Sequence, residues 1–262
     1  MKNFLIPFDF SSVSMNALEY AVKFAAGKEE ARIDLLYISK TKMKVNEEKE
    51  LKIIFDSLVS KFQGAGKPSI NYHFKTGNFT DTIVDMHSSL DIDLVIMGTS
   101  GGENGVASPV TRTSGLVLAA DLPVLVIPEK YKFFKLKKIL LALGEDVMHD
   151  TSTLNLLLDV SIGSKAEVDV ITVNRNPENI GYSEADERNE NTLQYYLEMF
   201  YSHHSFAENE DILEGIDNYI KKNEVDLLAI MPKTHSTISP PSKGKLTREV
   251  ILKSEIPVLV LD

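Results

Sequence analysis

The sequence has no cysteine among its 262 residues. Disulfide bonds, thiolate nucleophiles and cysteine-ligated metal sites are therefore excluded. Histidine is scarce as well, with six residues in the chain. Two of them, His203 and His204, are adjacent, so on a strand they would point to opposite faces and could not easily share one metal ion. We accordingly expect no metal site built by the protein alone.

The chain also has fewer basic than acidic residues and lacks long apolar runs. The chain has 28 Lys and Arg against 38 Asp and Glu, a net charge of -10, which opposes non-specific binding to nucleic acid. No apolar run approaches the roughly 20 residues that span a membrane. The first residues, MKNFLIPFDF, lack the layout of a signal peptide. We expect a cytoplasmic protein with neither nucleic acid nor a membrane as partner.

The chain repeats itself once. Four apolar segments of the first half recur in the second half at a near-constant offset of about 133 to 135 residues. Such an offset over both halves indicates duplication of a whole domain of about 130 residues rather than a short-period repeat. The paired segments are NFLIPF with KILLAL, IDLLYI with VDVITV, IDLVIM with VDLLAIM, and LPVLVI with IPVLVL.

A chain of this length suits two domains that each bury their own core. We place them at residues 1–130 and 136–262, with the boundary in the segment PEKYKFFKLK, residues 128–137. There Pro128 closes one apolar run and a basic stretch precedes the next. We interpret this stretch as a solvated linker rather than a nucleic-acid patch.

Short apolar strands alternate with stretches of helical periodicity, which is typical of a mostly parallel sheet covered on both faces. The fold class is α/β, with two tandem, doubly wound, Rossmann-like five-stranded sheets of order 3-2-1-4-5. The polar segment from Asn174 to Asn191 is interpreted as a long loop. In the first copy we predict strands at 3–8, 33–38, 69–74, 94–97 and 124–127, and helices at 14–26, 47–62, 79–89 and 113–120.

In this strand order, a ligand binds where the order reverses, beyond the carboxyl ends of strands one and four. Asp9 follows strand one, and its carboxylate could bind a ribose hydroxyl or an adenine amino group. Taken alone, it is better explained as a cap of the next helix. The loop after strand four, residues 98–112, combines four glycines with several hydroxyls and leads into a helix, which suits a phosphate.

The second copy has lost these features. Pro232 and Lys233 replace the glycine turn, and Gly144 stands where the offset places Asp9. Several lysines and Arg248 in the segment that follows are better explained as a solvated loop than as an anion site. We therefore expect no nucleotide site in the second copy, whose role would be structural pairing.

The blocks FLIPFDFSSVSMNALEYA, IDLLYI, IDLVIMGTSG and TRTSGLVLAADLPVLVIP resemble the universal stress protein family in its tandem two-domain form. The similarity covers nearly the whole chain and is closer in the first half. The resemblance implies a stress-response regulatory protein that binds an adenine nucleotide, ATP, ADP or AMP, in its N-terminal domain. Mg²⁺ would enter only together with that nucleotide.

The ATP-binding branch of the family has an aspartate after strand one and the motif G-x2-G-x9-G-[ST]. The end of the second strand offers its backbone to adenine. The resemblance thus assigns nucleotide-binding roles to Asp9, Ile38, Gly98, Gly101 and Thr111, and Arg112 in the same loop could add positive charge near the phosphates.

This sequence departs from the motif at its third glycine. Counting forward from Gly101 places Thr111 there, whereas counting back from Pro123 places Val110 there. Pro109 removes a backbone donor just before this point. Adenosine, AMP and ADP depend less on the missing glycine than a triphosphate does, so the choice among the three nucleotides stays open.

Two alternatives also stay open. One is a scaffold of the same fold that binds no nucleotide. In the family, the last strands pair across a two-fold axis, and here 123–126 and 257–260 would pair within the chain around a pseudo-two-fold axis, with a homodimer as a further option. The other is a slow ATPase, which needs a positioned base and metal ligands. Asp9 is the only candidate base, and we lean against an enzyme.

Overall fold

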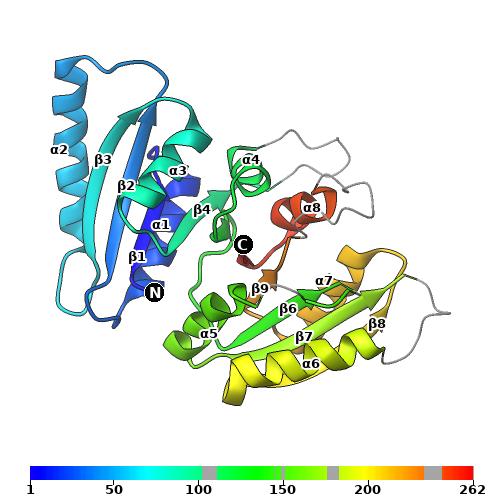
Figure 1. Cartoon of the computed structure of the whole chain (residues 1–262). Coiled ribbons are helices and arrows are strands. Elements are labelled where there is room, and N and C mark those ends of the chain that lie inside the picture. Colours follow the sequence, from blue (N-terminus) through cyan, green and yellow to red (C-terminus); the bar gives the residue numbers. More distant parts are fainter. Residues whose placement is uncertain (102–110, 145, 149–150, 176–182, 233–243, 262) are drawn as a thin grey trace. The chain divides into compact units, whose positions relative to one another are not determined.

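A computed structural model describes the chain apart from residues 102–110, 145, 149–150, 176–182, 233–243 and 262. The chain divides into two compact units, Met1–Phe134 and Lys135–Asp262. Each unit alternates strands and helices along the chain (Figure 1). None of the described helices is both long and apolar enough to cross a membrane.

The first unit has its strands in the order β3-β2-β1-β4-β5, and neighbouring strands run parallel. This confirms the predicted fold class and order for the first copy. Each expected strand and helix is present, with ends shifted by at most two residues. The elements are β1 (Asn3–Pro7), α1 (Ser12–Ala25), β2 (Arg32–Ser39), α2 (Val45–Phe62), β3 (Ser69–Thr76), α3 (Phe79–Ser89), β4 (Leu94–Thr99), α4 (Arg112–Ala119) and β5 (Val124–Pro128).

The second unit repeats this plan. Its strands run in the order β10-β9-β6-β7-β8, again parallel, which is the order of the first unit when the strands are matched by position in their copies. The elements are β6 (Lys138–Leu143), α5 (Thr153–Ser164), β7 (Glu167–Asn174), α6 (Glu184–Leu197), a 3-10 turn η2 (Glu198–Phe200), β8 (Tyr201–Glu208), α7 (Ile212–Asn223), β9 (Leu227–Ile230), α8 (Lys245–Lys253) and β10 (Val258–Val260).

The central strands of the first unit are buried on both faces, which explains their continuous apolar runs. The side chains of Phe4, Leu5 and Ile6 in β1 are fully buried, as are those of Leu94 to Ile96 in β4. Because strands β1 and β4 are neighbours and run parallel, their carboxyl ends lie at the same edge of the sheet. The buried core thereby fixes the positions of the two loops that follow these strands.

The polar segment from Asn174 to Asn191 is not one long loop, because helix α6 begins within it at Glu184. Its N-cap is Ser183, whose hydroxyl accepts a hydrogen bond from the Asp186 N–H at 3.1 Å, while the Asp186 carboxylate accepts one from the Ser183 N–H at 2.9 Å. Polar residues such as Asn189 occupy part of its buried face, which hid the helical periodicity. Residues 176–182 lie outside the described part of the chain.

Candidate functional site

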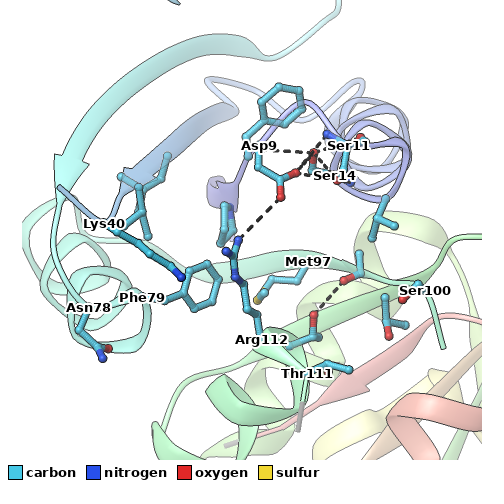
Figure 2. Close-up of a pocket in the computed structure, with 18 of the residues that line it drawn as sticks. Asp9, Ser11, Ser14, Lys40, Asn78, Phe79, Met97, Ser100, Thr111 and Arg112 are labelled. Carbon is cyan, nitrogen blue, oxygen red and sulfur yellow. Dashed lines mark hydrogen bonds and ion pairs between the residues drawn. The ribbon is translucent and has the colours of Figure 1, made fainter. Parts of the chain in front are cut away.

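A pocket of about 680 Å³ lies in the first unit, at the carboxyl ends of β1, β2 and β4 and the starts of α3 and α4 (Figure 2). The strand order of this unit reverses between β1 and β4, where doubly wound sheets bind their ligands. The volume is that of a small-molecule site. The lining residues are Pro7, Phe8, Asp9, Ser11, Val13, Ser14, Leu36, Ile38, Lys40, Gly77, Asn78, Phe79, Met97, Gly98, Thr99, Ser100, Thr111, Arg112 and Thr113.

The pocket contains five of the six residues expected to bind nucleotide. Asp9, Ile38, Gly98, Thr111 and Arg112 all line it. Gly101 comes two residues after β4 and is not among the described lining residues; its backbone has a φ of 80° and its N–H donates to Thr99 Oγ1 at 3.2 Å. The other glycines of the loop, together with Pro109 and Val110, lie outside the described residues.

Asp9 supports the start of helix α1 but is not its N-cap. The N-cap is Ser11, whose hydroxyl accepts a hydrogen bond from the Ser14 N–H at 3.2 Å. Asp9 Oδ1 in turn accepts three hydrogen bonds, from the Ser11 N–H at 3.1 Å, the Ser11 hydroxyl at 2.6 Å and the Ser14 hydroxyl at 2.9 Å. Asp9 can therefore support the helix start and bind a ligand at the same time, because only one of its carboxylate oxygens contacts the helix start.

The second oxygen of Asp9 faces Arg112, the first residue of α4 (Figure 2). Its Oδ2 lies 3.8 Å from a guanidinium nitrogen of Arg112. Burial acts to raise the pKa of Asp9, but the hydrogen bonds from Ser11 and Ser14 and the charge of Arg112 together outweigh it and hold this pKa below its usual value. Asp9 is therefore a carboxylate at neutral pH, able only to accept hydrogen bonds.

Phe10 holds the turn that follows Asp9. Its φ of 63° lies in the left-handed region, which costs a residue with a Cβ about 1 to 2 kcal/mol. Its ring packs against Phe8 and Phe55, with centroid distances of 5.0 and 4.7 Å. These aromatic contacts offset the backbone cost, because aromatic pairs contribute roughly 0.5–1.5 kcal/mol each beyond their buried area.

Gly98, at the end of β4, is required by close packing. A Cβ at this position would overlap the backbone carbonyl oxygen of Val13 in the first turn of α1. The carbonyl oxygen of Gly98 accepts a hydrogen bond from the Thr113 hydroxyl at 2.9 Å, which ties α4 to β4. The glycine therefore brings the starts of α1 and α4 up to the same strand end.

Helix α4 points its N-terminal end at the pocket. Its N-cap is Thr111, which exchanges hydrogen bonds with Ser114: the Thr111 hydroxyl accepts from the Ser114 N–H at 3.1 Å, and the Ser114 hydroxyl accepts from the Thr111 N–H at 3.0 Å. The first N–H groups of a helix have no partner within it and carry a partial positive charge. The start of α4, at Arg112 and Thr113, thus presents an electropositive edge to the pocket.

Sequence reasoning missed the residues that follow β2 and β3. Lys40 comes directly after β2, and its side chain points toward Phe79 (Figure 2). Asn78 caps α3 by accepting a hydrogen bond from the Thr80 N–H at 2.9 Å. Phe79, the first residue of α3, lies under Arg112, whose guanidinium carbon is 5.5 Å from the ring centroid. Considering the carboxyl ends of all four strands β1 to β4 would have found them.

The second unit has a different arrangement at the matching edge of its sheet. The loop after β6 is fastened to helix α6 through Asn189, whose side chain accepts from the Met148 N–H at 2.8 Å and donates to the Asp146 carbonyl at 3.0 Å. Pro232 follows β9, and Lys233 lies outside the described residues. Among the described residues of either unit, no group of three or more metal-ligating side chains comes together.

Known proteins similar to the chain share its fold and, over most of its length, its sequence pattern. Residues 1–128 match the model of the universal stress protein family. Universal stress protein Slr1230 from Synechocystis sp. is 26% identical over 241 residues, which cover 88% of this chain and 78% of that protein. A universal stress protein from Archaeoglobus fulgidus has the same fold, with a TM-score of 0.73, 17% identity and coverage of 99% of this chain and 97% of that one.

The fold by itself does not fix a function. The cytoplasmic domain of a prokaryotic cation chloride cotransporter is also similar, with a TM-score of 0.56, 14% identity and coverage of 100% of this chain and 95% of that one. The sequence matches are more specific than this likeness. The first unit, matched over residues 1–128, belongs to the universal stress protein family, and the similarity to the Synechocystis protein extends over most of the chain.

Proposed function

We propose that the chain is a stress-response regulatory protein whose first unit binds an adenine nucleotide, ATP, ADP or AMP, in the pocket around Asp9. The observation that carries this proposal is the division of the Asp9 carboxylate. One oxygen is held by three donors at the start of α1, and the other faces the pocket opposite Arg112. A fixed hydrogen-bond acceptor beside a cation suits a ligand that has hydroxyl groups in one part and negative charge in another.

The adenosine part would lie against the β1 and β2 side of the pocket. Leu36 of β2 supplies an apolar surface there, and Met97 of the neighbouring strand β4 adds to it. Ile38 lies near the end of β2, where its backbone can bind the edge of an adenine ring. Asp9 Oδ2 would accept hydrogen bonds from ribose hydroxyls. Pockets of this kind combine a mostly apolar lining with a few placed polar groups.

The phosphate part would lie at the start of α4. Helix N-termini bind phosphate through free N–H groups and the helix dipole. Arg112 and Lys40 add positive charge at the pocket, and Ser100 adds a hydroxyl. The Thr111 hydroxyl is already bonded to Ser114, so we assign Thr111 the role of shaping this helix start. A role for Gly101 in holding phosphate remains a prediction.

We propose binding rather than catalysis. Among the described pocket residues, Asp9 is the only carboxylate. Its hydrogen bonds and the charge of Arg112 lower its pKa, whereas a general base that works near neutral pH needs a raised one. Mg²⁺ would enter only with the nucleotide. The pairing of the last strands, the pseudo-two-fold relation of the domains, a homodimer, and the absence of nucleic-acid partners remain predictions.

Thermal melting of the whole chain with added nucleotide tests the proposal. Because a ligand that binds only the native state stabilises it by mass action, about 2.7 kcal/mol at 100 times its Kd, we expect the Tm to rise by several degrees with at least one of ATP, ADP and AMP. Asp9→Asn should reduce this rise, since it converts an ionised acceptor into a neutral amide.

The exposed Asp121 offers a matched control, because it lies outside the pocket lining. Asp121→Asn should leave the nucleotide-dependent rise in Tm unchanged. A wild-type protein with no rise at millimolar concentrations of any of the three nucleotides would point to the scaffold alternative instead.

A further inference from the structure

Arg112 spans the pocket and connects its two ends. The side chain starts at the first residue of α4 and reaches across to Asp9, which follows β1 (Figure 2). The guanidinium nitrogen is 3.8 Å from Asp9 Oδ2, and the two side chains are 63% and 51% exposed. Ion pairs that are this long and this exposed contribute little, so the contact is easily exchanged for another.

The Asp9 oxygen that Arg112 contacts is the one that a ligand needs. Asp9 Oδ1 already accepts hydrogen bonds from the Ser11 backbone, the Ser11 hydroxyl and the Ser14 hydroxyl. Only Oδ2 faces the pocket, so ribose hydroxyls that bind there compete directly with the guanidinium. A nucleoside that engages Asp9 through Oδ2 therefore weakens the contact between Arg112 and this oxygen.

Asp9 is the only carboxylate among the described residues that line the pocket, so a ligand has to supply any second anion for Arg112 there. Its backbone belongs to the first turn of α4, where helix N–H groups attract negative charge. Lys40 lines the same pocket and adds a second cation. A guanidinium binds phosphate through two parallel hydrogen bonds, which are stronger than its long contact with Asp9. The ring of Phe79 lies beneath the guanidinium and limits where it can move.

We propose that Arg112 determines ligand specificity by passing from Asp9 to a phosphate group, so that the pocket selects phosphorylated adenosine over adenosine. The inference rests on the proposed function and specifies the ligand class of the same site. Adenosine breaks the contact between Arg112 and Asp9 and gives Arg112 no anion in return. A nucleotide breaks the same contact and replaces the carboxylate with its own phosphate.

Calorimetric titration of the whole chain with adenosine and with AMP tests this role. In Arg112→Ala we expect AMP to bind about tenfold more weakly, the loss of a charge-assisted contact, and adenosine to bind unchanged or up to about fivefold more tightly. The preference for AMP therefore falls by at least about tenfold. Arg112→Lys should recover only part of it, because an ammonium keeps the charge but not the planar fork.

Lys42→Ala provides the charge control, because Lys42 is an exposed cation near Lys40 that is not among the pocket residues. It should leave the preference for AMP as in wild type. Equal weakening of AMP and adenosine in Arg112→Ala, or no change in either, would overturn the role of Arg112 while leaving nucleotide binding intact. Wild-type protein that binds neither ligand would instead overturn the proposed function, and this inference with it.

Discussion

At the scale of single residues, several residues that line the pocket also stabilise the fold. Asp9 holds the Ser11 cap with one oxygen and presents the other to the pocket. Gly98 admits the first turn of α1 and accepts a hydrogen bond from Thr113. Because the same atoms stabilise helix starts and form the site, substitutions here change stability and binding at once.

The Gly98→Ala substitution should show this coupling. A methyl group would overlap the backbone of Val13, so α1 or β4 must shift. Overpacking of this kind costs typically 1–3 kcal/mol, and we expect a reduced free energy of unfolding in urea titrations. Ser100→Ala, at an exposed position two residues along, should change the unfolding free energy by less than about 0.5 kcal/mol. Equal stability of Gly98→Ala and wild type would refute the packing role.

Some site residues could be predicted because they lie at the end of a strand, whereas others near strand ends were missed. Asp9 and Gly98 stand out in the sequence because each is an unusual residue at the end of an apolar run. Lys40 and Phe79 do not, since a lysine and a phenylalanine near a predicted helix are equally compatible with surface and core. That the Asp9 carboxylate is shared between cap and pocket depends on the direction of each oxygen, which only three-dimensional placement reveals.

At the scale of elements, the duplication preserves a polar feature of the sheet outside the pocket. Asp34 in β2 and Asp169 in β7 occupy matching strands, and both side chains are buried, at 2% and 3% exposed. Each lies beside a histidine of the next strand: His73 Nε2 is 2.8 Å from Asp34 Oδ1, and His203 Nδ1 is 3.3 Å from Asp169 Oδ1. The buried carboxylates thus help to fasten the edge strands β3 and β8.

Asp34→Ala should loosen the edge of the first unit. The carboxylate also accepts hydrogen bonds from Arg32 Nε at 2.6 Å and Asn71 Nδ2 at 3.4 Å, so its removal leaves three partners without this acceptor. Loss of such a buried acceptor costs about 1–3 kcal/mol, measurable as a lower Tm and faster hydrogen exchange in β3. Asp85→Ala, at an exposed position in α3, serves as control. Exchange in β3 at the wild-type rate would contradict the fastening role.

Elements whose buried face is apolar were predictable, and those with a polar buried face were not. The strands and helices of the first unit matched their periodicity to within two residues. Helix α6 was mistaken for a loop because Asp186 and Asn189 are buried on it, next to Leu193 and Leu197. Its buried polar groups are bonded to Ser183 and to the loop after β6, and such tertiary partners leave no signal in a hydrophobic pattern.

The side chains of His203 and His204 point to opposite faces of their strand, as strand periodicity predicts. His203 approaches Asp169 and the hydroxyl of Tyr219, at 3.0 Å from the latter, whereas His204 pairs with the Thr172 hydroxyl at 2.9 Å. The two rings therefore have different partners on different faces of β8. Alternation along a strand was sufficient to predict this separation without knowledge of the partners.

At the scale of the whole molecule, the two units share one fold but differ in the residues that follow their central strands. Both units have the strand order of a doubly wound fold. The first has a pocket lined by Asp9 and Arg112. In the second, Gly144 stands in place of that aspartate and Asn189 fastens the loop after β6 to a helix. The duplication was evident from the offset of apolar segments, and so was the contrast between the glycine turn and Pro232.

This contrast leads to a defined stoichiometry. If the first unit alone has a nucleotide site, the whole chain binds one adenine nucleotide, and a calorimetric titration with AMP, ADP or ATP measures that number directly. We predict a single saturable site per chain that Asp9→Asn weakens. Two equivalent sites would contradict the assignment of binding to the first unit, and the absence of saturable binding by all three nucleotides would contradict the proposed function itself.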